Sequence, residues 1–349
     1  MSSKSRLIEF DILKGLGILF VILGHSVPDF PVNLRADFLS GTIEKLLYSF
    51  HMPLFFICAG YMVQMFDSKQ LVSGGGFLKK KFLRLIVPYM CFSIAVLILK
   101  ILFSSFTRSG VDFCDSIYGI MFEGKYYWFL YVMFLVLTTV ELLRRLKVKY
   151  LYVWLIAFSF YLLGLYLNTS FLCLNRFGYY FLFTMVGTLA YKYKSSIDKF
   201  VSHWYSNLIL FLVFASLFSV RVPDVLIIKE LFRFILAIVG TTLTYSLSLW
   251  IKENCNKMTA ILSYFGVMSL AYYLVHMINQ LPIYYLVAKM NLPIPVLSVV
   301  AIFAITTLLT YIMVKIMNSI PICRFMMGMS MSKKINFNEP RTKNKLSAE

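Results

Sequence analysis

A series of long apolar segments constrains the fold of this chain more than any other feature. A helix needs roughly 20 mostly apolar residues to cross a bilayer. Ten such segments lie at about residues 10–28, 45–66, 83–103, 126–143, 150–168, 174–191, 206–220, 230–251, 259–288 and 294–317. With 60% hydrophobic and 14% charged residues, the chain has more apolar surface than a soluble domain of this length can bury. The sequence therefore predicts an all-α, polytopic membrane helix bundle with about ten transmembrane helices.

The positions of Lys and Arg predict the orientation of this bundle. The net charge is +18, and 22 of the 34 Lys and Arg residues lie in the two terminal segments and in alternate loops between the spans. Because cationic loops stay in the cytoplasm, we expect both termini to be cytoplasmic and the cations to contact anionic lipid rather than nucleic acid. Residues 1–325 form the expected membrane domain and 326–349 a polar cytoplasmic tail. We expect Pro282 to break the overlong ninth span, or the end of that span to lie along the membrane interface.

The first apolar segment contains three ionisable residues, Asp11, Lys14 and His25. Such groups are costly inside a bilayer and mark functional sites. Lys14 and His25 are eleven residues apart, so they lie on nearly the same helix face, separated by about 16 Å. Asp11 is three residues before Lys14 and can form an ion pair with it. This polar face predicts a water-lined path, although Asp11 and Lys14 at a membrane interface would serve orientation alone.

Two further histidines, His51 and His276, lie in apolar segments and, in the expected orientation, share the outer half of the bilayer with His25. Histidine exchanges protons near neutral pH, which suits general acid–base chemistry. A tris-histidine metal centre is the less favoured interpretation, because no carboxylate or closely spaced cysteine pair accompanies the histidines. We therefore expect no metal.

Two other segments are candidate binding sites. A basic run before the third span contains Lys80, Lys81 and Arg84; it either sets topology through lipid contact or binds an anionic cytosolic ligand that carries phosphates. Tyr127 and Trp128 open the fourth span. They form either an interfacial aromatic belt or a platform on which a sugar stacks.

Together these segments resemble the acyltransferase 3 family of bacterial membrane proteins, which O-acylate sugars, and the opening segment is particularly similar to fucose acetylases. Four motifs in chain order carry the resemblance: Asp11–Ile18 with Gly24–His25, Phe50–Phe56 with Gly60–Tyr61, Lys81–Arg84 before Pro88–Tyr89, and Gly266, Ser269 and Tyr273–His276.

The resemblance implies a multi-pass enzyme of the bacterial cytoplasmic (inner) membrane. It would move an acetyl group from cytosolic acetyl-CoA to a hydroxyl of a surface polysaccharide or lipid-linked sugar. His25 would be the general base, Lys14 would hold donor phosphate or polarise the thioester, and Asp11 would orient Lys14. The basic run would bind the phosphates of CoA. His51 and His276 would orient His25 or contact the substrate.

Two other functions fit a bundle of this kind. A glycan transporter also has about ten spans with buried ionisable groups, but the inverted repeats typical of secondary transporters are not evident in this sequence. A protein that handles lipid-linked sugars without acyl transfer is the second. Consumption of a thioester donor that depends on His25 would separate the enzyme from both.

Overall fold

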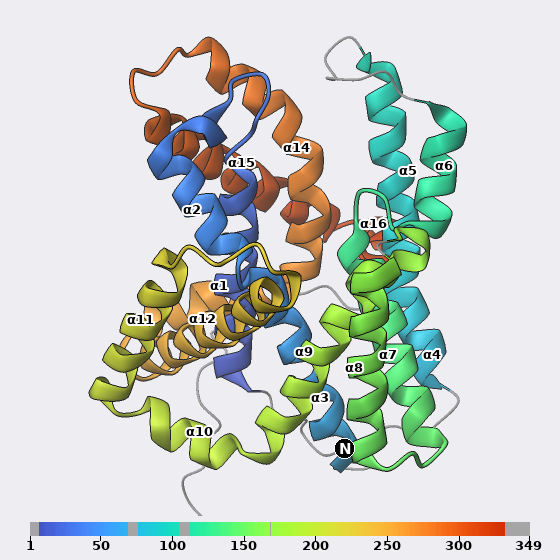
Figure 1. Ribbon diagram of the computed structural model, residues 1–349. Coiled ribbons are helices and arrows are strands. Elements are labelled where there is room, and N and C mark those ends of the chain that lie inside the picture. Colours follow the sequence, from blue (N-terminus) through green and yellow to red (C-terminus); the bar gives the residue numbers. More distant parts are fainter. Residues whose placement is uncertain (1–6, 69–75, 105–111, 168, 332–349) are drawn as a thin grey trace, which may run out of the picture.

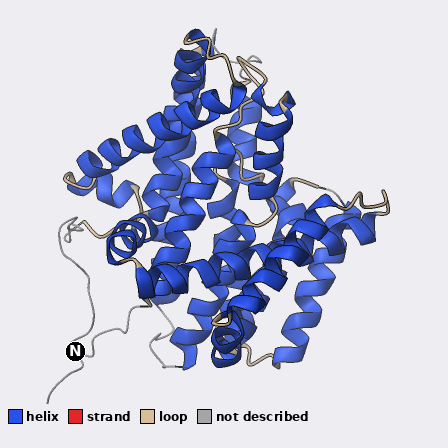
Figure 2. Ribbon diagram, turned by 90° about the vertical axis from the view of Figure 1, so that its left-hand side faces the viewer, coloured by secondary structure: helices blue, strands red, loops and turns tan. Residues whose placement is uncertain are grey.

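The computed structural model describes residues 7–68, 76–104, 112–167 and 169–331. Within these ranges the chain is helical and contains no strand (Figure 2). The first half comprises α1 (Ile8–His25), η1 (Leu34–Ala36), α2 (Phe38–Tyr48), α3 (His51–Ser68), α4 (Gly76–Lys81), the π-helical turn η2 (Phe82–Ile86), α5 (Val87–Leu102), α6 (Phe113–Phe122), α7 (Trp128–Arg145) and α8 (Tyr150–Leu167). The second half comprises η4 (Phe171–Cys173), α9 (Leu174–Lys192), α10 (Lys194–Val201), α11 (Trp204–Ser219), α12 (Leu226–Asn254), α13 (Asn256–Val267), α14 (Ser269–Lys289), α15 (Pro295–Met317) and α16 (Pro321–Met326).

The helices divide the upper part of the molecule into two lobes that stand on a common base (Figure 1). One lobe holds α2, α14 and α15, and the other holds α5 and α6. Helix α1 begins near the base and ends, at His25, in the first lobe. The upper and lower ends of α1 mark the two ends of the molecule.

The helix faces that point away from the molecule are strongly apolar. Tyr166 on α8 is 88% exposed, and Leu151 and Trp204 are exposed as well. In water such faces would aggregate, whereas in a bilayer they contact lipid. Five helices of the described residues are long and apolar enough to cross a membrane, or seven if each of two bent pairs is one span.

The membrane-bundle prediction is therefore supported in its general form. Every one of the ten predicted segments contains a helix, but α1 and α7 carry several charged residues each, and the number ten stays a prediction. Both ends of the chain, 1–6 and 332–349, lie outside the described residues, so their cytoplasmic location also stays a prediction.

The break in the ninth predicted span was placed wrongly. Helix α14 runs through Pro282, and the break instead falls at Met268, where α13 and α14 meet at 75°. Gly266 lies just before this bend, and a Cβ at this position would lie 1.8 Å from the carbonyl oxygen of Asp11. Helices α1 and α13 thus pack backbone against backbone, and α14 starts in a new direction.

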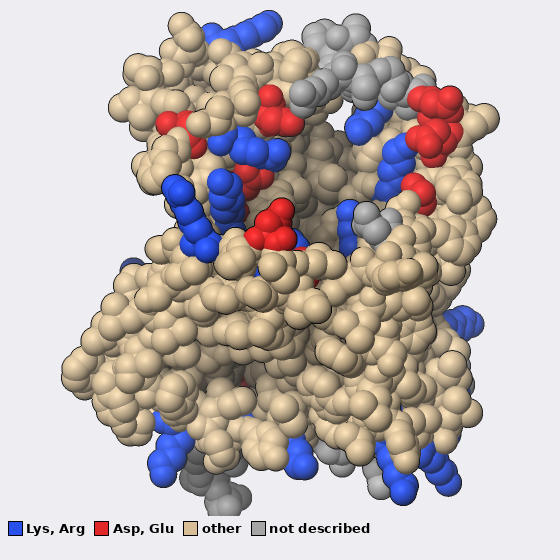
Figure 3. All heavy atoms as spheres, viewed as in Figure 1, with Lys and Arg blue, Asp and Glu red and all other residues tan. Residues whose placement is uncertain are grey.

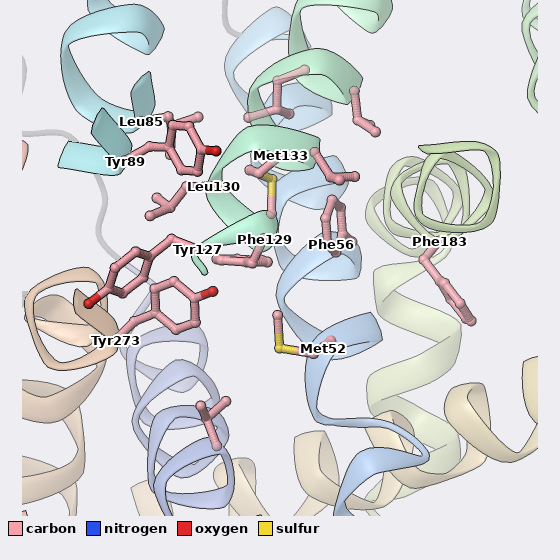
Figure 4. Close-up of a cluster of buried hydrophobic side chains, with 14 of the residues drawn as sticks. Met52, Phe56, Leu85, Tyr89, Tyr127, Phe129, Leu130, Met133, Phe183 and Tyr273 are labelled. Atoms are coloured by element: carbon pink, nitrogen blue, oxygen red, sulfur yellow. The ribbon is translucent and has the colours of Figure 1, made fainter. Parts of the chain in front are cut away.

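A buried aromatic and aliphatic cluster fills the space between α3, α7, α9 and α14 (Figure 4). Phe56 stacks on Tyr180 with ring centroids 4.4 Å apart, and Phe129 lies 5.2 Å from Tyr273. Helices α3 and α9 approach as closely as α1 and α13 do, since a Cβ at Gly60 would lie 1.9 Å from the carbonyl oxygen of Thr184. This packing fixes the elements that carry the histidines.

Candidate active site

Three histidines from three helices converge near the upper end of α1. His25 is the last residue of α1, His51 the first of α3, and His276 lies within α14. The rings of His25 and His276 are 5.6 Å apart, and Tyr48 links the other pair, with its ring 5.8 Å from His25 and 4.9 Å from His51. The sequence-based expectation that these histidines lie in one region is matched by this geometry.

The backbone fixes the proton positions of two of these rings. Nδ1 of His51 lies 2.6 Å from the carbonyl oxygen of Leu47, and Nδ1 of His276 lies 2.9 Å from that of Tyr272. A carbonyl accepts hydrogen bonds and cannot donate them, so Nδ1 carries the proton in both rings. In the neutral imidazole, Nε2 is then a free acceptor. Nε2 of His276 is buried and has no hydrogen-bond partner among the described residues.

His25 has a polar partner that sequence analysis missed. The hydroxyl of Tyr48 lies 3.2 Å from Nδ1 of His25, and nearby Arg35 donates to buried Glu44 at 2.7 Å. This hydrogen bond raises the pKa of the Arg35 guanidinium. The spacing in the sequence could have revealed this group. Glu44, Tyr48 and His51 follow one another at intervals of four and three residues, which is the spacing of residues on one face of a helix.

A cavity of about 380 Å³ leads from the lower half of the molecule toward this histidine cluster. Its inner wall includes Met52, which follows His51 in the chain, and Tyr273, whose ring is 5.8 Å from that of His276. Apolar side chains such as Phe55 and Met133 line its middle. The cavity is thus long and apolar, with the histidines beyond its inner end.

Cations surround the outer part of this cavity. Lys81 and Arg84 both line it, whereas Lys80 is exposed and does not. Lys14 also lines the wall and donates to buried Asp11 at 2.9 Å. The sequence pattern therefore placed Lys14 and Asp11 together correctly, and the basic run divides into residues that face the cavity and one that does not.

Two more charged residues at the cavity were not foreseen. Glu141 is buried and accepts two hydrogen bonds of 2.8 Å from Arg144, and one of 2.8 Å from Arg145. Glu141 and Arg144 line the cavity together with Arg84. Sequence analysis assigned the arginines to topology alone and did not consider the carboxylate one helical turn before them.

The two aromatic residues at the start of α7 differ in their surroundings. Tyr127 is fully buried, and its hydroxyl donates to the carbonyl oxygen of Leu274 at 2.7 Å, so it lies within the protein wall (Figure 4). Trp128 is half-buried and carries the guanidinium of Arg176 at 4.8 Å from its ring. Within the described ranges no three His, Cys, Asp or Glu side chains form a group able to hold a metal ion.

Comparison with known proteins agrees with this geometry. The sequence profile of the acyltransferase 3 family, described as an acyltransferase domain, matches residues 7–315. The chain belongs to the acyltransferase 3 family. The four motifs noted in the sequence all lie in the matched region, so the family resemblance is confirmed over nearly the whole chain.

Two curated relatives match over shorter stretches. Nodulation protein NolL of Sinorhizobium fredii is 28% identical over 141 residues, which cover 37% of this chain and 34% of the relative. Nodulation protein NolL of Mesorhizobium japonicum is 26% identical over 169 residues, which cover 45% and 40%. The chain thus matches about two fifths or less of either relative's length. No solved structure matches the chain.

Proposed function

We propose that this acyltransferase is a membrane-bound O-acetyltransferase that moves an acetyl group from cytosolic acetyl-CoA to a hydroxyl of a cell-surface polysaccharide sugar. The observation that carries the proposal is the continuity between the two parts of the site. A cation-lined cavity suited to a phosphorylated donor ends beside three histidines suited to proton transfer. Family membership supplies the acyl-transfer chemistry in general.

The donor fits the cavity by charge and by shape. CoA carries its phosphates at one end and a thioester at the end of a thin pantetheine arm. Lys81 and Arg84 offer charge-assisted hydrogen bonds to phosphates, while Met133 and Phe55 form an apolar passage for the arm. In this arrangement the thioester reaches the inner end of the cavity, near Met52 and Tyr273.

The chemical step needs a base at that inner end. His25 takes the proton from the sugar hydroxyl as its oxygen attacks the thioester carbonyl. The new C–O ester bond forms, the C–S bond breaks, and the CoA thiolate leaves and is protonated. Lys14, held by Asp11, stabilises negative charge on the donor side. His51 and His276 are proposed to orient His25 or to contact the substrate through their free Nε2 atoms.

The acceptor is proposed to approach from the upper end of the molecule. In this proposal the chain lies in the bacterial inner membrane with ten spans and both termini in the cytoplasm. The cavity mouth then faces cytosolic acetyl-CoA, and the histidines face the envelope glycan. O-antigen, capsule and exopolysaccharide are the acceptor classes, and a lipid-linked sugar is the alternative form in which the acceptor would arrive.

NMR of envelope polysaccharide from the native host tests the proposal. Three strains are compared: wild type, a deletion, and the deletion complemented with His25→Ala. Base-labile acetyl signals are expected in the wild type alone, and their position identifies the acceptor hydroxyl. Unchanged acetylation in all three strains, with the glycan still made, would refute acyl transfer. Loss of the surface glycan itself would instead support transport or assembly.

A further inference from the structure

Two turns at the upper end of the molecule hold an unusual backbone conformation. Tyr126 has φ 69°, and the adjacent residues Leu172 and Cys173 have φ 50° and 52°. Side chains larger than glycine rarely adopt this left-handed region, and such strain often accompanies a functional site. The two turns brace each other, since the Cys173 thiol donates to the carbonyl oxygen of Glu123 at 3.0 Å. They fix the starts of α7 and α9.

These braced turns present Arg176 on an aromatic stack. The guanidinium of Arg176 lies 4.8 Å from the Trp128 ring, and the ring of Tyr180 lies 5.2 Å from Trp128. Arg176 is exposed, and no carboxylate of the described residues lies within ion-pair distance of it. Arg233, the comparable arginine on α12, donates to Glu230 at 2.6 Å. Arg176 therefore has a free, oriented guanidinium fork, whereas Arg233 is neutralised.

Arg176 belongs to the same continuous set of aromatic contacts as the histidine cluster. A series of ring contacts connects Trp128 to the cluster: Phe129 is 6.4 Å from Trp128, Tyr273 is 5.2 Å from Phe129, and His276 is 5.8 Å from Tyr273. Figure 3 shows the hollow between the two upper lobes, with charged side chains around it. Helix α6 of one lobe contacts η4, directly before α9.

We propose that Arg176, held against Trp128, is a binding subsite for an anionic group of the acceptor glycan. The group is a uronate carboxylate of the glycan or a phosphate of a lipid-linked sugar, because the planar guanidinium binds both through two parallel hydrogen bonds. The inference rests on the proposed function, since it assigns a charge to the acceptor that reaches the histidines. Trp128 supports the guanidinium and adds an aromatic surface beside it.

Binding to the purified full chain tests the subsite without catalysis. The first probe pair is trigalacturonate and its trimethyl ester, which differ in charge alone. The second pair is farnesyl diphosphate and farnesol. At low salt the wild type is expected to bind at least one anionic probe about tenfold or more tightly than its neutral counterpart. The pair that shows the preference identifies the source of the anion.

Variants assign the preference to this residue. Arg176→Gln is expected to abolish the preference, Arg176→Lys to retain part of it, and the matched control Arg233→Gln to retain all of it. The inference is overturned if wild type shows no preference in either pair, or if Arg176→Gln keeps it. Acetylation that depends on His25 but without a charge preference would refute the subsite alone. Arg176-dependent binding without acetylation would refute the proposed function alone.

Discussion

At the scale of single residues, the hydrogen bond between Tyr48 and His25 is the contact most specific to the proposed base. The other two histidines donate from Nδ1 to backbone carbonyl oxygens four residues earlier in the chain, whereas Nδ1 of His25 meets a side-chain hydroxyl that can donate or accept. Such a partner can follow the ring through a change of protonation. Tyr48 is therefore a positioning residue for His25.

Removing this hydroxyl is expected to slow turnover without weakening donor binding. A hydrogen bond contributes about 0.5–1.5 kcal/mol, so Tyr48→Phe should lower kcat roughly two- to tenfold and leave KM for acetyl-CoA unchanged. Acetyl incorporation in membrane vesicles that carry the host glycan measures both. Tyr166→Phe, which changes an 88% exposed ring, is the control. A rise in KM with unchanged kcat would contradict the positioning role.

The sequence identified histidines more readily than their partners, for a physical reason. An imidazole in an apolar segment is conspicuous because ionisable groups are rare there. Tyrosine is common in membrane proteins, so Tyr48 does not stand out in the sequence. Glu141 lies near cationic residues that already have a topological explanation. Their roles arise from tertiary contacts, with His25 in one case and with the cavity wall in the other.

At the scale of elements, the basic run passes from α4 into the π-helical turn η2, and its cations differ in whether they line the cavity. The wider turn spans Phe82–Ile86 and includes Arg84, and such turns are frequent at functional sites. Arg84 lines the cavity, while Lys80, one turn earlier on α4, is exposed and does not line it. Charge alone could not distinguish the two residues in the sequence.

Substitution of these two cations should therefore have unequal effects. Hydrogen bonds to charged groups contribute roughly 1.5–3 kcal/mol, so Arg84→Gln is expected to raise KM for acetyl-CoA by about tenfold or more, with kcat little changed. Lys80→Gln, which removes the same charge outside the cavity, should stay within about twofold. Initial rates at varied donor concentration in the vesicle assay provide the comparison. Equal effects of the two substitutions would mean that the basic run acts through its summed positive charge rather than through contacts inside the cavity.

Two glycines allow pairs of helices to cross with their backbones in contact. Gly266 faces the Asp11 carbonyl, and Gly60 faces that of Thr184, so neither backbone can move away without displacing a whole helix. Gly266→Ala and Gly60→Ala are each expected to destabilise the protein by about 1–3 kcal/mol. The measurement is the fraction of detergent-solubilised protein that stays monodisperse after heating. Gly76→Ala is the control, because its nearest neighbour is the flexible side chain of Lys80 at 3.7 Å.

The bend at Met268 shows what helix propensity could not predict. Pro282 was the visible helix breaker, yet α14 continues through it. The actual bend follows Gly266, at the close crossing of α1 and α13. Ten apolar segments were readable from local composition, whereas this crossing joins residues more than 250 positions apart in the chain.

At the scale of the whole molecule, the proposed function requires that the two ends of the protein face opposite compartments. The cavity is lined by Lys14, in the first half of α1, whereas His25 is the last residue of that helix. The charge bias predicts that the lower end is cytoplasmic. If both ends faced one compartment, acetyl-CoA and envelope glycan could not meet at His25 from opposite sides.

Cysteine labelling tests this arrangement. Lys229, near the start of α12, and Lys257, near the start of α13, are both exposed and are predicted to face opposite sides of the membrane. Cys114 is exposed, so the background variant carries Cys114→Ser. In spheroplasts, a membrane-impermeant maleimide is expected to label Lys229→Cys at once, and Lys257→Cys after permeabilisation. Labelling of both from the same side would contradict the single predicted span, residues 230–251, between them. It would also require the acceptor and the donor to enter from one compartment, which the proposed mechanism does not allow.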